Sequence, residues 1–418
     1  MACKGSGVQI PSAPHWIMKE FLYETKELLL SQGLIAILAI VQVRIVATNL
    51  GPEIYGNIGV YLGFVGISFR FLSSRNSDLI LINFKSTNRN FLRSSIYFET
   101  LLGVISLMFV LGIFFVYYNF IYNYLIFYFV TRVFVNIQEV FKGVFTDAGD
   151  MKTYSLVESS SNIIRFILVV SFVSINPAIS SFFYALSFHQ IFVSILVLVL
   201  LIRNDVSKVD RMTLREYINL SKTNFYKIRT DQAVGLIPAH LDVVIIGYFA
   251  NYYSAGIYRI AKKLVDPINS IIFAFSPWVL NKINKENNFN FKNLTKNILL
   301  PSSLVIISFY YFFGNNLIEV IAGKEFIESY FPMMILLFGF LSYYMTFWTR
   351  HFLFMNDLIF KHTLGRIINL VIFLITGPIL ITYYGFNGIA ASISLSIMTQ
   401  KLYELSTYMK FKNIKNNY

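Results

Sequence analysis

Long apolar runs separated by short polar turns follow one another along almost the whole chain. A helix needs about 20 apolar residues to cross a bilayer, so these runs predict transmembrane helices. The pattern predicts twelve of them, at 28–48, 56–83, 95–118, 120–141, 154–175, 179–202, 231–250, 254–280, 297–313, 330–349, 362–383 and 386–408. We therefore expect an all-α integral membrane protein.

A basic stretch, residues 203–230, interrupts this pattern between the sixth and seventh predicted helices. Its apolar residues recur near helical spacing with basic residues between them, which predicts an amphipathic helix on the anionic inner leaflet. The stretch acts as a cytoplasmic linker and divides the chain into two six-helix bundles, residues 28–202 and 231–408. Residues 1–27 and the basic tail 409–418 are predicted to be cytoplasmic ends.

The two predicted bundles begin with similar hairpins. RIVATNLGPEIYGNIGVYLGF (Arg44 to Phe64) closes one apolar helix with a turn and opens another, and Leu241 to Pro267 does the same. Each second helix restarts at a glycine, Gly56 or Gly256. Because six crossings is an even number, the two bundles share one orientation. We expect them to be related by a pseudo-two-fold axis along the membrane normal and to enclose a central cavity.

The distribution of positive charge along the chain predicts how the helices are oriented in the membrane. The 418 residues are 56% hydrophobic and 14% charged, with a mean hydropathy of +0.60 and a net charge of +13. Lys and Arg gather in alternate connections, for example 85–93, 203–229 and 282–296, whereas the turns NLGPEIYG, NYYSAG and YYGFNG have none. Because positively charged loops stay in the cytoplasm, both termini are predicted to be cytoplasmic. The charge excess is then an orientation signal, and no nucleic-acid partner is expected.

The first residues lack the apolar core of a secretory signal. They contain Pro11 and Pro14 and predict an unstructured leader, with Met1 or Met18 as the start of translation. Cys3 is the single cysteine, which excludes an internal disulfide and a cysteine-based metal site. Because the sequence also lacks a Walker A loop, G-x-S-x-G and H-E-x-x-H, neither an enzyme nor a cofactor is predicted.

Three short stretches resemble one family of membrane transporters. D-x-x-I-I-G-x-F followed by AG-x-Y-x-x-A-x-K-L, from Asp242 to Leu264, is similar to the seventh and eighth helices of Wzx-type O-antigen and polysaccharide flippases. The turn G-P-E-x-Y-G, from Gly51 to Gly56, resembles their first hairpin, and Ile368 to Ser396 resembles their last two helices. These flippases belong to the MOP superfamily, which also holds the MATE drug exporters.

The resemblance implies two six-helix bundles in a V. It also implies alternating-access movement of undecaprenyl-pyrophosphate-linked oligosaccharide, an O-antigen or capsule repeat unit, from the cytoplasmic to the outer leaflet of the bacterial inner membrane. An O-antigen polymerase and a chain-length regulator would be further partners. Two alternatives stay open: a MATE-like drug or cation exporter, which would have an acidic cavity, and an O-antigen polymerase or ligase, which would have a large exterior loop.

Charged side chains inside the predicted spans are the candidate site. An ionisable group at bilayer depth costs about 2.5–3.5 kcal/mol on insertion, so it faces a partner or a wet cavity. Six cations are predicted to line the pathway of the pyrophosphate, namely Arg44, Arg70, Arg132, Arg165, Arg259 and Lys263. Local pairing or snorkelling is the alternative for each cation. We expect Lys262 to pair with Asp266, and Arg366 lies close enough to its helix end to snorkel.

Three carboxylates, Glu158, Asp231 and Asp242, are candidates for coupling transport to H+ or Na+. A carboxylate held in a cavity can bind and release a cation, which is the chemistry that coupling needs. His189 and His240 titrate near neutrality, although a lone His on an apolar helix is more often a packing residue. The sequence leaves the coupling ion and the sugar of the repeat unit open.

Overall fold

The computed structural model describes residues 13–72, 90–118, 122–135, 138, 151–203, 214–272, 275–276, 279 and 291–416, and it contains no strand over these ranges. The longer helices are α1 Ala13–Leu72, α3 Asn90–Tyr118, α4 Asn123–Arg132, α6 Met151–Ile175, α7 Ile179–Arg203, α8 Leu214–Phe249, α9 Tyr252–Val265, α12 Leu300–Ile321, α13 Tyr330–Thr346 and α15 Ile359–Asn416. The shorter elements are α11 Phe291–Leu294, the π-helix η3 Thr295–Leu299, the 3₁₀-helix η4 Lys324–Ser329 and α14 Trp348–Met355.

Over the described ranges, eight helices are long and apolar enough to cross a membrane. Two of them account for more than one predicted span each, because α15 contains the last two, and α1 contains the first and the described part of the second. The shorter helices α4 and α9 carry two more, so each of the twelve predicted spans overlaps a described helix, six in each half of the chain. Parts of the spans 56–83, 120–141 and 254–280 lie outside the described residues. The expected all-α membrane fold is confirmed.

Two glycines turn the chain back within the long helices. The backbone kinks in α1 at Gly51 (φ 71°, ψ 172°) and in α15 at Gly385 (φ 56°, ψ −140°). A positive φ is strained for residues with a Cβ atom, so glycine is needed at both places. Both kinks lie in turns without Lys or Arg, NLGPEIYG and YYGFNG, which the sequence predicts to be exterior.

Two helices begin earlier than the sequence predicts. The helix α1 starts at Ala13, inside the leader predicted to be unstructured. Pro14 does not prevent this, because it stands in the first turn of the helix, where proline is tolerated. The helix α8 starts at Leu214, so the basic linker is partly continuous with the seventh span. No Gly or Pro stands between Leu214 and the start of that span, and a helix once nucleated propagates at little cost.

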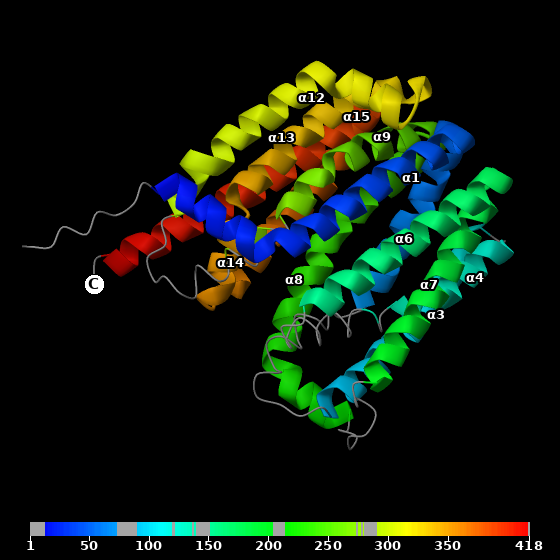
Figure 1. Ribbon diagram of the computed structural model, residues 1–418, viewed down its shortest axis with the longest axis horizontal. Coiled ribbons are helices and arrows are strands. Elements are labelled where there is room, and N and C mark those ends of the chain that lie inside the picture. Colours follow the sequence, from blue (N-terminus) through cyan, green and yellow to red (C-terminus); the bar gives the residue numbers. More distant parts are fainter. Residues whose placement is uncertain are drawn as a thin grey trace, which may run out of the picture.

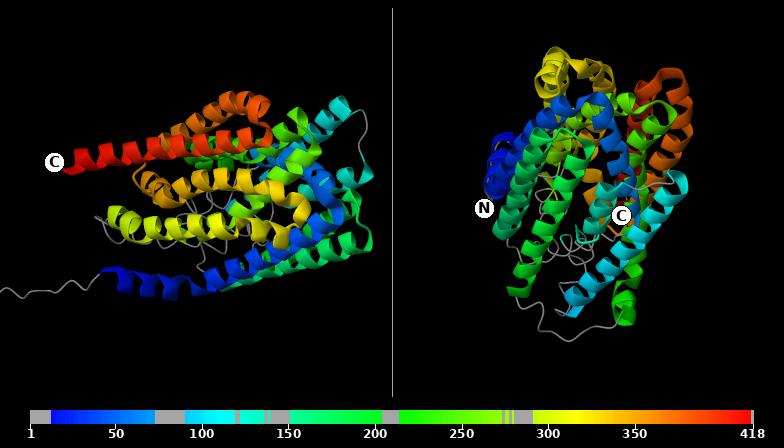
Figure 2. Two further views of the ribbon diagram at one scale, coloured as in Figure 1. Left: turned by 90° about the horizontal axis from the view of Figure 1, so that it is seen from above. Right: turned by 90° about the vertical axis from the view of Figure 1, so that its right-hand side faces the viewer.

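The helices form two groups (Figure 1). The helices α3, α4, α6 and α7 gather on one side and α12, α13 and α15 on the other, with α1, α8 and α9 between them. The helix α1 packs against α6 in its own half and against α8 and α9 of the other half, while α15 packs against α13 and α8. The start of α1 and the end of α15 lie at the same end of the molecule (Figure 2).

The two repeated hairpins contact each other at the opposite end. A Cβ atom added to Gly56 would lie 1.8 Å from the carbonyl oxygen of Tyr252, and one added to Gly256 would lie 2.0 Å from the carbonyl oxygen of Pro52. Only glycine permits backbones to approach this closely. The contact continues along α1, where a Cβ atom on Gly63 would lie 2.8 Å from the carbonyl oxygen of His240. We refer to the contact of Gly56 with Gly256 and its flanks as the hairpin seal.

Candidate functional site

Two cavities lie between the halves. The larger cavity, of about 600 Å³, is lined by α1, α8, α9, α13, α14 and α15. The smaller cavity, of about 300 Å³, is lined by α1, α4, α6, α7 and α9. Leu62, Arg259 and Lys263 line both cavities. The helix α9, which belongs to the second hairpin, therefore forms part of a wall that the two cavities share.

The smaller cavity is cationic. Four of the predicted pathway residues line it, Arg132 from α4, Arg165 from α6, and Arg259 and Lys263 from α9. Its remaining polar lining consists of neutral amides, Tyr hydroxyls and His189, and none of its described lining residues is acidic. The fold thus brings cations from both halves around one space.

Arg165 reaches the smaller cavity from the middle of α6. Its Nε atom is buried, and among the described residues no group accepts a hydrogen bond from it. Its neighbour in the cavity wall, His189, is held differently, because its Nε2 atom lies 3.0 Å from the hydroxyl of Ser161. A buried donor without an acceptor destabilises the fold, so Arg165 is better suited to binding an anion than to holding helices together.

Arg259 is fixed in the wall between the cavities. Its Nη1 atom donates to the carbonyl oxygen of Tyr55 at 2.8 Å, and its guanidinium carbon lies 4.4 Å from the centre of the Tyr55 ring. Gly59 makes room for it, since a Cβ atom there would lie 2.8 Å from Arg259 Cδ. Arg259 therefore joins the second half to the first across the cavities.

The lysine of α9 that pairs with Asp266 is not the one that the sequence predicts. Lys263 pairs with Asp266, with 2.7 Å between Nζ and Oδ2, whereas Lys262 pairs with Asp242 of α8 at 2.5 Å. The prediction that Lys262 pairs with Asp266 is wrong. Spacings of three and four residues both allow a pair on a helix, and the choice depends on α8, which presents a buried carboxylate to Lys262.

Asp242, a candidate for ion coupling, lines the larger cavity with none of its side chain exposed. Its carboxylate accepts hydrogen bonds from the Tyr258 hydroxyl at 2.8 Å, from Lys262 Nζ at 2.5 Å and from the backbone N–H of Val243 at 2.8 Å. Tyr258 and Lys262 belong to α9, so Asp242 holds α8 and α9 together.

The structure does not bring three of the predicted residues, Arg44, Arg70 and Glu158, into the described cavity walls. Arg44 is exposed on α1 and lines neither of them. Arg70 belongs to α1, but its side chain lies outside the described residues. Glu158, a candidate for ion coupling, lies on α6 and also lines neither cavity. The roles predicted for these three residues stay predictions.

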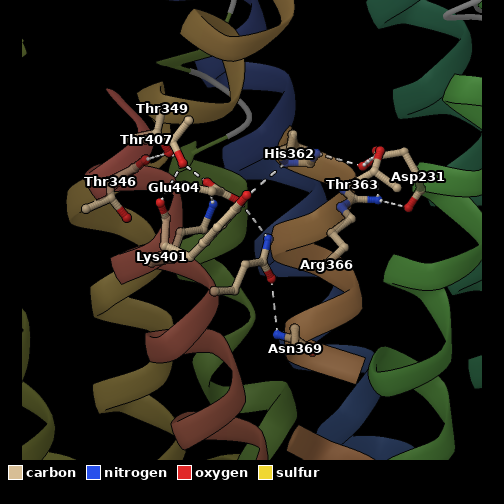
Figure 3. A network of polar contacts seen from close by, with 12 residues as sticks. Asp231, Thr346, Thr349, His362, Thr363, Arg366, Asn369, Lys401, Glu404 and Thr407 are labelled. Carbon is tan, nitrogen blue, oxygen red and sulfur yellow. Dashed lines mark hydrogen bonds and ion pairs between the residues drawn. The ribbon is translucent and has the colours of Figure 1, made fainter. Parts of the chain in front are cut away.

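A polar cluster lies in the core of the second half (Figure 3). Asp231 of α8 bonds to His362 Nδ1 at 2.7 Å and pairs with Arg366 at 3.2 Å. Arg366 also donates to the carbonyl oxygen of Asp231 at 2.7 Å. Gly235 makes room for this guanidinium, since a Cβ atom there would lie 2.4 Å from Nη1. Arg366 therefore turns inward to a buried partner, and the snorkelling alternative is wrong.

The cluster continues to the last span through Glu404. Lys401 Nζ lies 2.7 Å from Glu404 Oε2, and neither side chain is more than 3% exposed. The Thr349 hydroxyl and the Gln400 amide also donate to Glu404, at 2.7 and 2.8 Å. His362 stands between the two acids, with Nε2 3.6 Å from Glu404 Oε1. Because this buried pair has so many hydrogen-bond partners, it determines how α14 and the two arms of α15 pack together.

Sequence reasoning missed three members of this cluster, His362, Lys401 and Glu404. All three are ionisable residues inside the last two predicted spans, and that position was the available signal. Over the described residues, no group of three or more His, Cys, Asp or Glu side chains could hold a metal ion. The carboxylates that line the larger cavity or belong to the cluster each form an ion pair with a Lys or Arg of this chain; they are Asp231, Asp242, Asp266 and Glu404.

The chain is similar to known proteins of polysaccharide biosynthesis. The family described as "Polysaccharide biosynthesis protein" matches residues 24–280, which is more than half of the chain. The capsular polysaccharide biosynthesis protein CapF of Staphylococcus aureus is 24% identical over 322 residues, which make up 72% of this chain and 77% of CapF.

Two solved structures share the fold. One is an inward-facing multidrug resistance MATE family transporter of the MOP superfamily, with a TM-score of 0.71 and 14% identity, covering 91% of this chain and 96% of the other. The second is the lipid II flippase MurJ in an inward closed conformation, with a TM-score of 0.71 and 16% identity, covering 94% of this chain and 87% of MurJ. These likenesses confirm the predicted fold of twelve helices in two six-helix bundles.

Proposed function

Because the chain belongs to the polysaccharide biosynthesis protein family, we propose that it is a flippase for lipid-linked polysaccharide. Its substrate is an undecaprenyl-pyrophosphate-linked oligosaccharide, an O-antigen or capsule repeat unit. The protein moves this substrate from the cytoplasmic to the outer leaflet of the bacterial inner membrane. The capsular relative and the fold shared with a lipid flippase support this proposal.

The choice of substrate rests on one observation, the positive charge of the smaller cavity. The smaller cavity places three arginines and a lysine around a space whose described lining has no acidic residue. A pyrophosphate that joins a lipid to a sugar carries two negative charges, which such a cavity can neutralise. Arginine suits this anion because its planar fork binds two phosphate oxygens at once.

The hairpin seal supports alternating access. We place the seal at the outer face, with both termini in the cytoplasm, so that this state takes up substrate from the cytoplasmic side. The sequence supports this orientation, because the turns that meet in the seal, NLGPEIYG and NYYSAG, have no Lys or Arg, whereas the basic connections are predicted to lie on the side of the termini. Release on the outer side then requires the seal to separate and the opposite end to close.

Two other functions fit the geometry less well. A drug or cation exporter with the same fold needs an acidic cavity, whereas the smaller cavity here is basic. A polysaccharide polymerase or ligase needs a large exterior loop for its catalytic residues. The connection that the sequence predicts as the longest exterior one, between α12 and α13, holds little beyond the six residues of η4.

The proposal also includes the coupling of transport to an ion and the protein partners. Asp231 and Asp242, with Glu158, are the carboxylates through which transport is coupled to H+ or Na+. The burial of Asp231 and Asp242 in contact with lysine, arginine and histidine supports protons in preference to Na+, because their oxygens are already engaged by built-in donors. The O-antigen polymerase and the chain-length regulator are the expected protein partners.

Substitution of the cavity cations tests the function. In a strain that depends on this protein, Arg165→Ala and Arg259→Ala should each lower surface polysaccharide at least about tenfold, because a lost charge-assisted hydrogen bond costs about 1.5–3 kcal/mol. Lipid-linked repeat units should accumulate on the cytoplasmic leaflet. The same assay of Arg44→Ala and Arg70→Ala tests the roles predicted for those residues.

The matched control is Lys324→Ala. Lys324 is 86% exposed, pairs with Glu319 at 3.4 Å and lines neither cavity. Its removal should leave surface polysaccharide unchanged. Wild-type display from both Arg165→Ala and Arg259→Ala would contradict the proposed function.

A further inference from the structure

The two ion pairs of α9 differ in a way that bears on how substrate is bound and released. Asp242 is completely buried, and its partner Lys262 is 20% exposed and also donates to the Ala239 carbonyl oxygen at 2.6 Å. Lys263 and Asp266 are 45% and 34% exposed. The first pair is built into the packing of α8 against α9, whereas the second can open without disturbing either helix.

We propose that Asp266 competes with the anionic group of the substrate for Lys263. While the site is empty, Asp266 holds the ammonium group. When the substrate enters, its pyrophosphate takes that place, and on release Asp266 takes Lys263 back. This inference rests on the proposed function, because it takes the competing anion to be a lipid-linked pyrophosphate.

The position of Lys263 fits this role. It lines both cavities, while Asp266 lines only the larger one, so the pair lies at the border between an acid-free space and a space that contains carboxylates. Over the described residues, Lys263 is the only one of the four cations of the smaller cavity that pairs with a carboxylate. An ammonium group on a flexible four-carbon stem can exchange one oxygen partner for another by rotation alone.

The energetics favour an exchange over permanent pairing. A partly exposed pair on one helix contributes little to stability, so a doubly charged pyrophosphate can displace the carboxylate. Asp266 then weakens substrate binding slightly and speeds release on the outer side. Removing its charge should tighten binding and slow turnover, which is the opposite of what loss of a substrate-binding residue would do.

Titration calorimetry on the full chain in detergent tests the competition, with farnesyl pyrophosphate as the probe. Asp266→Asn should bind the probe about two- to fivefold more tightly than the wild type, which corresponds to about 0.4–1 kcal/mol. Asp266→Glu keeps the charge and should bind like the wild type. Glu319→Gln opens a comparable exposed pair outside the cavities and should also leave the affinity unchanged.

A double substitution isolates the pair. Lys263→Ala should weaken binding, and Asp266→Asn added to Lys263→Ala should bring no further gain, because the carboxylate then has no lysine to occupy. If the wild type binds the probe and Asp266→Asn binds it equally or more weakly, the competition is excluded while the proposed function stands. A gain that persists without Lys263 would also exclude it. If neither the wild type nor Asp266→Asn binds the probe, the proposed function fails with it.

Discussion

At the scale of single residues, Arg165 and Arg366 lie in contrasting surroundings, which suit two different purposes. Arg366 has its charge neutralised by Asp231 and donates to a backbone carbonyl oxygen. Arg165 leaves a buried Nε atom without an acceptor among the described residues, in the wall of the smaller cavity. The first arrangement stabilises the fold, whereas the second costs stability and leaves a donor ready for an anion.

Replacement of each arginine by methionine should separate these purposes. Arg165→Met should leave the thermal midpoint of the purified protein unchanged or raise it, because it removes an unsatisfied buried donor, yet it should abolish probe binding. Arg366→Met should lower the midpoint, because it takes a cation from the buried Asp231, at a cost of about 3–5 kcal/mol. The measurements are thermal unfolding in detergent and calorimetry with farnesyl pyrophosphate. A large loss of stability in Arg165→Met would show that its role is structural.

The sequence was informative about which residues are charged within the membrane, but not about their partners. Insertion cost alone identifies Arg132, Arg165 and Arg259 as residues that need a cavity or a partner. Whether Lys262 or Lys263 pairs with Asp266 depends on the rotation of α9 against α8, which a single helix does not encode. For this reason the inward turn of Arg366, and the cluster to which it belongs, could not be predicted.

At the scale of elements, the hairpin seal depends on the absence of two side chains. Gly56 and Gly256 allow α1 and α9 to touch backbone to backbone. The sequence predicts both hairpins and places a glycine at the restart of each, because apolar runs must be helical in a bilayer and their interruptions must be turns. It does not show that the two turns meet, since that contact joins residues about two hundred positions apart. The kinks at Gly51 and Gly385 were easier to predict, because each lies inside a predicted turn.

A single methyl group should therefore open the seal. Gly256→Ala would place a Cβ atom 2.0 Å from the Pro52 carbonyl oxygen, so the two backbones must separate. We expect a loss of stability of about 1–3 kcal/mol from this overpacking, together with loss of polysaccharide export.

The matched control for Gly256→Ala is Gly112→Ala in α3. A Cβ atom at Gly112 would meet nothing within 4 Å, so alanine should be neutral or stabilise the helix by up to about 1 kcal/mol. Thermal unfolding and surface polysaccharide should be measured for both variants. Equal behaviour of the two variants would contradict a tight seal between the hairpins.

At the scale of the whole molecule, the proposed function requires the two halves to separate at the seal so that substrate can leave on the outer side. Val60 of α1 and Gly247 of α8 face each other one turn inside the seal, and a Cβ atom on Gly247 would lie 3.6 Å from Val60 Cβ. Disulfides form when the two Cβ atoms are about 3.5–4.5 Å apart. The halves can therefore be linked covalently with little distortion.

The variant carrying Val60→Cys and Gly247→Cys, in a background with Cys3→Ser, should cross-link on mild oxidation. We expect the oxidised protein to stop exporting polysaccharide and to recover when a reductant is added, because the disulfide holds the outer ends together. Each single-cysteine variant, treated with the same oxidant, controls for damage unrelated to the bond. Cross-linked protein that exports at the rate of the reduced form would show that the two halves need not part at the seal. The substrate would then have to leave by a path other than the one between α1 and α8.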